Sequence, residues 1–240
     1  MSNLSLKIIA IITMTIDHIG IIFFPENDIF TAIGRLSFMI ITFLLIEGYF
    51  HTSNLKKYIG RLIIFGIIID LIMLTLGLFE VSNVFLSLGF GLLFVTVIDY
   101  HHSRNIFIII ILLLISQSLM YGVYGMLLIF LFYVFKKKDI KKMHQLIILV
   151  AFTIISIKFL GVSSMQYYSL LALPVIFTYN GKIGYKSILT KYAFYIYYPL
   201  HLTLLQLLYI CITWPKKKAS YINVTSLFKF NYLLQNQLVI

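Results

Sequence analysis

The sequence predicts an all-α fold, a polytopic transmembrane helical bundle of about nine spans, with about eight to ten as the range. Hydrophobic residues make up 61% of the 240 residues, whereas charged residues make up only 11%. The mean hydropathy is +0.99, and apolar runs that approach the roughly 20 residues of a membrane-crossing helix recur along nearly the whole chain. These runs do not alternate between apolar and polar positions, as the strands of a membrane barrel would.

Short polar loops separate the first four predicted spans. The first span, near 5–24, ends at "FFPEND", and the second span, near 30–50, ends at "HTSNLKK". The third span, near 57–79, ends at "FEVSN", after which the fourth span runs near 83–99. Each loop carries proline or several charged and polar residues, which interrupt an apolar helix and therefore mark the end of a span.

Basic loops divide the second half of the chain. Spans five and six, near 105–120 and 121–135, lie between "HHSR" and "KKKDIKK", and the border between them is the least defined. Spans seven and eight, near 145–161 and 165–180, lie between "KKKDIKK" and "NGKIGYK". The last span, near 191–213, ends before the final lysine cluster.

One integral-membrane domain is expected over residues 1–214, followed by a polar, basic tail over 215–240 that is interfacial or disordered. No cleavable signal peptide is expected, because the first apolar run lacks a small-residue cleavage site. The single cysteine, Cys211, excludes an intrachain disulfide and a cysteine-based metal site. No metal site is predicted at His101 and His102 either, because this basic loop has no carboxylate ligands at helical spacing.

The net charge of +11 comes from basic residues that gather in the loops between apolar runs. Under the positive-inside rule this clustering sets the membrane orientation, so we predict no nucleic-acid partner and regard contact with acidic lipids as a by-product. With a cytoplasmic N-terminus, most basic loops face the cytoplasm, and Glu26, Asp28 and Glu80 lie outside. The cluster at 216–218 is the exception, because nine spans would place it outside.

Ionisable side chains within the spans are the candidate functional residues, because at membrane depth they cost several kcal/mol unless they are paired or hydrated. These residues are Asp17, His18, Arg35, Glu47, Arg61, Asp70 and His201.

Structural explanations compete with function at several of these positions. An ion pair with Arg35, at a similar depth in the outer half, would explain Asp17. A salt bridge or snorkelling would explain Glu47 and Arg61, which lie towards cytoplasmic span ends. Asp70 lies deeper, where it could pair with a basic residue or orient a histidine, and the sequence does not choose between the two.

Lys7 and His18 share one face of the first span. Eleven helical steps of 100° bring their side chains back to within about 20° of each other, with a rise of about 16 Å. A long donor with an anionic head and a reactive far end would suit this spacing, with phosphate on Lys7 and the acyl group near His18. Asp17 points about 100° away from His18, so each of the two needs its own partner.

Five sequence blocks, in order over about residues 4–210, resemble the TraX family of membrane proteins. The blocks are "LKIIAIITMTIDHIG" (6–20), "IGRLSFMIITFLLIEGYFHTSNLKKYIGRLIIFGIIID" (33–70), "NVFLSLGFGLLF" (83–94), "YGVYGMLLIFLFY" (121–133) and "KYAFYIYYPLHL" (191–202). The best-known activity of this family is acetylation of the N-terminal amine of a conjugative pilin. The family is distantly similar to the acyltransferase-3 superfamily, whose hallmark of a basic residue, ten residues and a histidine in the first span is matched by Lys7 and His18.

The resemblance implies acetyl-CoA as the acyl donor, entering from the cytoplasm. It implies that His18 is the catalytic base with Asp17 beside it, and that Lys7 contacts the donor phosphates, with Arg61 as a second candidate for donor binding. We assign the remaining candidates as site-orienting residues, and these are Arg35, Glu47, Asp70 and His201. The alternative for His201 is a structural role, in which a neighbouring helix merely supplies a hydrogen-bond partner for its imidazole.

We therefore expect a membrane-embedded acetyltransferase of the bacterial cytoplasmic membrane that acts on a peptide or protein N-terminal amine, as in a pilin, or on another surface-directed acceptor such as a glycan. The alternative is a proton-coupled transporter or flippase in which Asp17, His18, Asp70 and His201 form a proton relay. A third class, a structural partner in a secretion or conjugation assembly, predicts that His18→Ala is silent. The sequence identifies neither the acceptor nor the oligomeric state.

Overall fold

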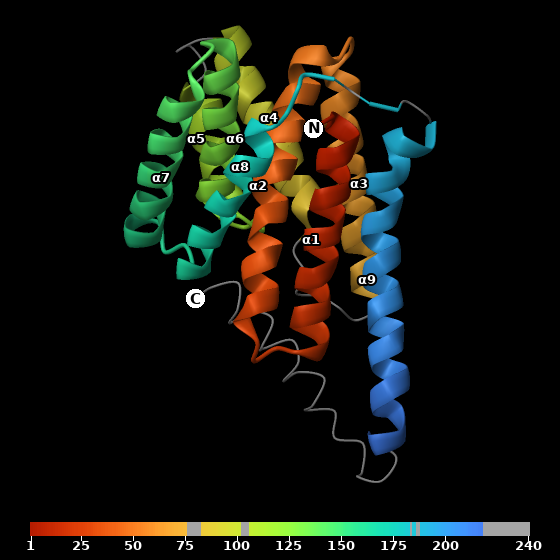
Figure 1. The fold of residues 1–240 in the computed structure, drawn as a ribbon. Helices are drawn as coiled ribbons and strands as arrows, with labels where there is room; N and C mark the ends of the chain where they lie inside the picture. The colour runs from red at the N-terminus through yellow and green to blue at the C-terminus, as the bar shows by residue number, and fades with distance from the viewer. Residues whose placement is uncertain (76–82, 102–105, 183, 186–187, 218–240) are drawn as a thin grey trace. The chain divides into compact units, whose positions relative to one another are not determined.

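The computed structural model describes residues 1–75, 83–101, 106–182, 184–185 and 188–217 (Figure 1). Within these ranges the regular structure is helical and includes no strand, which confirms the predicted all-α fold. The helices, in chain order, are α1 (Asn3–Phe23), α2 (Asp28–His51), α3 (Leu55–Thr75), α4 (Val84–His101), α5 (Ile106–Ser116), α6 (Gly122–Lys137), α7 (Lys142–Phe159), the 3-10 helix η2 (Ser164–Leu171), α8 (Ala172–Phe177) and α9 (Ile188–Lys217).

Each predicted span corresponds to one helix or to a pair of short helices. The span predicted near 165–180 is η2 followed by α8, rather than one continuous α-helix. The undefined border between spans five and six is a turn between Ser116 and Gly122, where Gly122 takes a positive φ of 51° that a residue with a side chain rarely adopts. The predicted end of span three beyond residue 75 and the tail from residue 218 lie outside the described residues.

Four of the described helices are long and apolar enough to cross a membrane. They are Asn3–Phe23, Asp28–His51, Lys142–Phe159 and Phe194–Ile212. Shorter apolar helices accompany them, such as α5, whose 11 residues extend only about 16 Å at ~1.5 Å per residue. Many large apolar side chains of the long and the short helices are exposed, including Phe107 of α5 at 77% and Phe159 of α7 at 78%. The protein is therefore a helical membrane protein whose helices differ in length.

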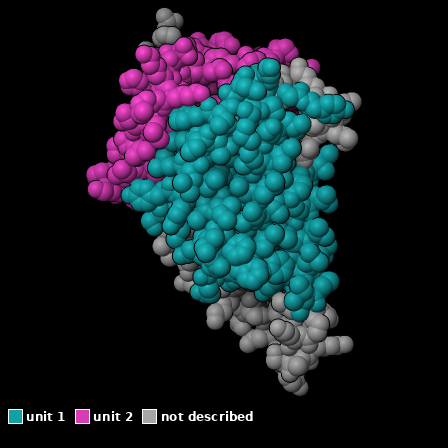
Figure 2. All heavy atoms as spheres, in the orientation of Figure 1, with its two compact units in different colours: residues 1–40, 163–240 teal, residues 41–162 magenta. Residues whose placement is uncertain are grey.

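The chain folds into two compact units (Figure 2). Unit 1 comprises residues 1–40 and 163–240, and unit 2 comprises residues 41–162. Unit 1 is thus assembled from the two ends of the sequence, and the first part of α2 belongs to it. Whether residues 1–214 act as one functional domain stays a prediction.

In unit 1, α1 and α9 pack against each other and run in the same direction (Figure 1). Thr15 of α1 contacts Tyr197 of α9, and further along both helices Phe23 contacts Tyr209 through an edge-to-face ring pair.

The start of α1 is fixed by the segment that precedes α9. The backbone N–H of Asn3 donates to the carbonyl oxygen of Lys182 (2.8 Å), and the N–H of Asn180 donates to the carbonyl oxygen of Met1 (3.0 Å). Ser2 caps the helix, because its side-chain oxygen accepts the N–H of Ser5. These contacts hold the start of α1 against the segment at residues 180–182.

In unit 2, α4 packs on both α3 and α6, and glycines permit the close approach of α3 and α4. A Cβ atom added at Gly66 would lie 2.6 Å from Cδ2 of Leu86 and 3.1 Å from its backbone nitrogen. A Cβ atom added at Gly89 would lie 2.9 Å from Cγ1 of Ile63. Since a backbone atom cannot rotate away, a side chain at Gly66 would force the two helices apart.

We predict that Gly66→Ala destabilises the protein by about 1–3 kcal/mol, the usual effect of adding a methyl group to a filled contact. Gly60→Ala in the same helix is the matched control, because a Cβ there meets nothing within 4 Å, and it should be neutral or stabilising by about 0.5–1 kcal/mol. Thermal unfolding of the detergent-solubilised variants measures the difference. Equal melting temperatures for the two variants would contradict the packing described for α3 and α4.

Candidate active site

Two histidines from opposite ends of the chain form the centre of unit 1. Nδ1 of His18 on α1 lies 2.7 Å from Nε2 of His201 on α9, and the two side chains are 8% and 5% exposed. Their rings are close to coplanar, at 23°, with centroids 4.9 Å apart, which is the arrangement of a hydrogen bond in the plane of both rings. The structure therefore gives His18 a specific polar partner, and His201 is more than a packing residue of α9.

Tyrosines of α9 enclose this histidine pair. The ring of Tyr197 lies parallel to that of His201, with centroids 4.7 Å apart, and the buried ring of Tyr198 meets His18 edge-on at 6.1 Å. Tyr197 also bonds Thr15 of α1 through its hydroxyl (2.6 Å). These two tyrosines thus help to hold α9 on α1 around the site.

Asp17 lies against α2 rather than against α9. A Cβ atom added at Gly34 would lie 2.2 Å from Cγ of Asp17, so the carboxyl group rests directly on the α2 backbone. Oδ1 of Asp17 and Nε of Arg35 are both buried and have no hydrogen-bond partner in the described part of the chain. The described contacts include no ion pair of 4 Å or less between Asp17 and Arg35. Oδ1 of Asp17 is therefore buried against α2 without a hydrogen-bond partner among the described residues.

Lys7 lies on α1, about three turns before His18, and its side chain is half-buried. It forms no hydrogen bond or ion pair with any residue that the structure describes. A half-buried lysine without a carboxylate partner fits an anionic group of a substrate, and it equally fits a lysine that extends its amine to the membrane surface.

The candidates on α3 and on the second part of α2 belong to unit 2. Oε1 of Glu47 forms an ion pair with Nζ of Lys136 (2.7 Å), so the buried Glu47 has a partner on α6. Arg61 stacks its guanidinium 5.8 Å from the ring centroid of Tyr58. Their predicted roles in orienting the site and in binding the donor stay predictions.

Asp70 pairs with an asparagine, and neither of the two alternatives drawn from the sequence describes it. The side-chain amide of Asn83 donates to Oδ1 of Asp70 and also to the carbonyl oxygen of Gly66 (2.9 Å). The amide oxygen of Asn83 accepts the N–H of Leu86 (3.2 Å) and so caps α4. Asp70 thus orients the capping residue of α4, which is a structural role.

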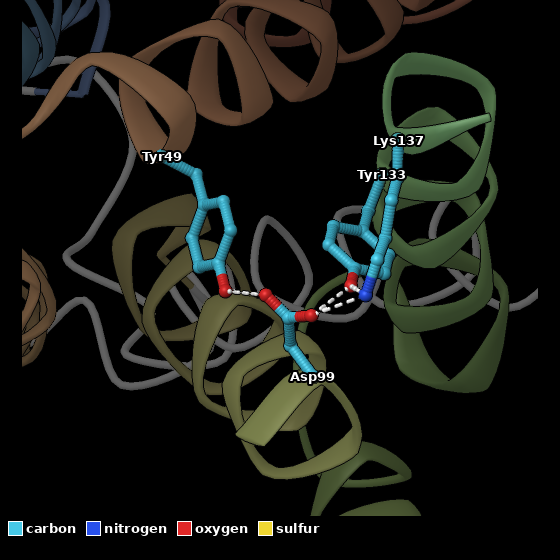
Figure 3. Close-up of polar contacts among 4 residues, drawn as sticks. All are labelled: Tyr49, Asp99, Tyr133 and Lys137. Carbon is cyan, nitrogen blue, oxygen red and sulfur yellow. Dashed lines mark hydrogen bonds and ion pairs between the residues drawn. The ribbon is translucent and has the colours of Figure 1, made fainter. Parts of the chain in front are cut away.

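Unit 2 holds a polar cluster that the sequence analysis missed, centred on Asp99 of α4 (Figure 3). Its Oδ2 accepts the hydroxyl of Tyr49 (2.6 Å), and its Oδ1 accepts Nζ of Lys137 (2.5 Å) and the hydroxyl of Tyr133. One carboxylate therefore connects α2, α4 and α6. Asp99 is the last residue of the span predicted near 83–99 and was not among the candidate residues, and the lysines that follow Tyr133 were interpreted as a signal for membrane orientation.

The geometry supports proton transfer in unit 1 and mechanical stability in unit 2. A buried imidazole hydrogen-bonded to a second imidazole can take a proton from an attacking group. The Asp99 cluster instead connects helices, because its two carboxylate oxygens accept hydrogen bonds from side chains of α2 and α6. In the parts of the chain that the structure describes, no three or more histidine, cysteine, aspartate or glutamate side chains are grouped so as to hold a metal ion.

Comparison with known proteins extends over nearly the whole chain. Residues 2–209 match the family described as TraX protein. A "Probable fimbrial assembly protein FimC, serogroup H1" of Dichelobacter nodosus is 29% identical over 231 residues, which cover 85% of this chain and 94% of that protein. An "Uncharacterized protein RP591" of Rickettsia prowazekii (strain Madrid E) is 32% identical over 126 residues, 49% of each chain. No solved structure matches the chain.

We predict that Tyr49→Phe lowers the free energy of unfolding by about 1.5–3 kcal/mol, because it removes a hydrogen bond to a charged group in a partly buried site. Tyr100→Phe is the matched control, since Tyr100 adjoins Asp99 in sequence but is 68% exposed, and its removal should change stability by less than about 0.5 kcal/mol. Denaturation of the detergent-solubilised protein measures both. If both substitutions have the same small effect, Asp99 does not hold the three helices together.

Proposed function

This chain belongs to the TraX family, and we propose that it is a membrane-embedded acyltransferase that moves an acetyl group from acetyl-CoA to the N-terminal amine of a peptide or protein, or to another surface-directed acceptor such as a glycan. The description of its Dichelobacter relative as a probable fimbrial assembly protein supports a pilin-like acceptor. The observation that carries the proposal is the buried hydrogen bond between His18 and His201.

His18 is the general base of the proposed reaction. As the acceptor nitrogen forms a bond to the acyl carbon, His18 takes the proton that this nitrogen loses. The carbon–sulfur bond of the thioester then breaks, and the thiolate of coenzyme A leaves. His18 gives this thiolate the proton that it took from the acceptor nitrogen. The protein needs no other proton donor, because the proton gained in the first step is returned in the second.

Asp17 is suited to hold the acceptor. Its Oδ1 is buried without a hydrogen-bond partner among the described residues, and it lies one residue from the base on α1. A carboxylate oxygen accepts hydrogen bonds from an amine, so an acceptor amine held there would be fixed near His18. Asp17 lies against α2, whereas His18 contacts α9. We therefore propose that the amine binds beside α1, between the side that faces α2 and the side that faces α9.

Lys7 is suited to hold the phosphates of the donor. It lies eleven residues before His18 on the same helix, a rise of about 16 Å, and a phosphate would provide the anionic partner that it lacks among the described residues. This placement brings the donor from the N-terminal end of α1, which we propose to be cytoplasmic. We propose the bacterial cytoplasmic membrane as the location, where acetyl-CoA is available on that side.

We predict that the purified protein binds acetyl-CoA, that Lys7→Ala weakens binding about 10-fold, and that His18→Asn leaves it unchanged. A lost charge-assisted hydrogen bond accounts for the first change. Asn in place of His18 keeps a donor where Nδ1 stood and removes the second ring nitrogen, so it should lower the rate of acetyl transfer about 10²–10⁴-fold. Calorimetry measures binding, and mass spectrometry of an acceptor peptide measures transfer.

The matched control for Lys7→Ala is Lys158→Ala, which removes an exposed lysine of α7 in unit 2 and should change neither quantity. If the wild-type protein binds no acetyl-CoA and modifies no peptide, the acyltransferase proposal is wrong and a proton-coupled transporter becomes the better reading of the same buried residues. If His18→Asn transfers acetyl groups at the wild-type rate, His18 is not the base.

A further inference from the structure

His201 has one of its protons fixed by the backbone of its own helix. Nδ1 of His201 lies 2.7 Å from the carbonyl oxygen of Tyr197, four residues earlier on α9. A carbonyl oxygen can only accept a hydrogen bond, so Nδ1 of His201 must carry the proton. In a neutral imidazole the other nitrogen, Nε2, then has a lone pair and no proton.

The lone pair on Nε2 of His201 in turn fixes the proton of His18. Nδ1 of His18 is the atom 2.7 Å from this lone pair, and two lone pairs cannot form a hydrogen bond. Nδ1 of His18 must therefore be the donor, and Nε2 of His18 is left unprotonated. Among the described residues, Nε2 of His18 makes no hydrogen bond, so this nitrogen is available to a bound substrate.

We infer that His201 is a positioning residue that locks His18 in the tautomer protonated at Nδ1, so that Nε2 of His18 is the nitrogen that accepts the proton. This inference rests on the proposed function for its chemical meaning, although the tautomer itself is a property of the resting protein. His201 does not touch the acceptor or the donor in this arrangement. It acts through His18, as a carboxylate does when it orients a catalytic histidine.

The surroundings of the pair support a fixed tautomer. Both rings are at least nine-tenths buried, so water does not compete for the two hydrogen bonds. The parallel ring of Tyr197 and the edge of Tyr198 limit the rotation of His201. A flip of the His201 ring would remove both hydrogen bonds in a site that offers few alternatives.

We predict that nitrogen NMR of the full-length protein, with ring-labelled histidine and reconstituted in lipid, shows His18 protonated at Nδ1 and unprotonated at Nε2. Assignment uses His18→Asn, since the chain has six histidines. His201→Phe, which keeps an aromatic ring without an acceptor, should abolish this preference. His201→Gln, which places an amide oxygen where Nε2 stood, should preserve it. A wild-type His18 protonated at Nε2, or at both nitrogens near neutral pH, would overturn the inference.

Kinetics separate this role from a structural one. His201→Phe should lower kcat by about 100-fold or more, as loss of the correct tautomer does in other histidine bases, with KM for acetyl-CoA unchanged, whereas His201→Gln should recover most of kcat. His144→Phe, an exposed histidine of α7, is the control and should change nothing. If no variant and no wild type transfers acetyl groups but the NMR result holds, the proposed function fails while the tautomer assignment stands. Equal losses of kcat in His201→Phe and His201→Gln would overturn the positioning role.

Discussion

Side chains that form hydrogen bonds have no water to bind inside hydrocarbon, so they must find partners on other helices of the protein. In unit 1 this constraint joins α1 to α9 through the buried side chains of His18 and His201. In unit 2 hydrogen bonds to Asp99 join three helices near the end of a predicted span. Apolar packing alone would not select these neighbours, because lipid tails are as apolar as leucine and a helix gains little by exchanging one for the other.

The helical elements were predictable because hydropathy reports directly which segments enter the membrane. What hydropathy could not report is how far each helix continues. The span near 165–180 was predicted, but hydropathy did not show that its first part is a 3-10 helix that precedes a short α-helix, because both helix types can have the same apolar composition. Hydropathy also could not reveal that the two ends of the sequence build one unit, because the hydropathy of a span does not indicate which other helix it packs against.

The sequence identified several candidate residues of the site but not which of them lie in contact. His18 stood out as an ionisable residue in an apolar run, whereas its partner on α9 could be found only once the two helices were seen side by side. Asp99 was overlooked because it lies where a span meets a loop, the position at which a charge is least surprising. The role of Asn83 had a usable signal, because asparagine directly before an apolar run is a common helix cap, and that signal would have explained Asp70.

The 183 positions that separate His18 from His201 have a consequence for biosynthesis. At a translation rate of roughly 5–20 residues per second, the first helix waits on the order of 10–40 s before its partner leaves the ribosome. During that time the imidazole of His18 lacks its partner on α9, so a chain that ends before α9 cannot form the His18–His201 pair. The pair therefore forms only after most of the polypeptide has been synthesised.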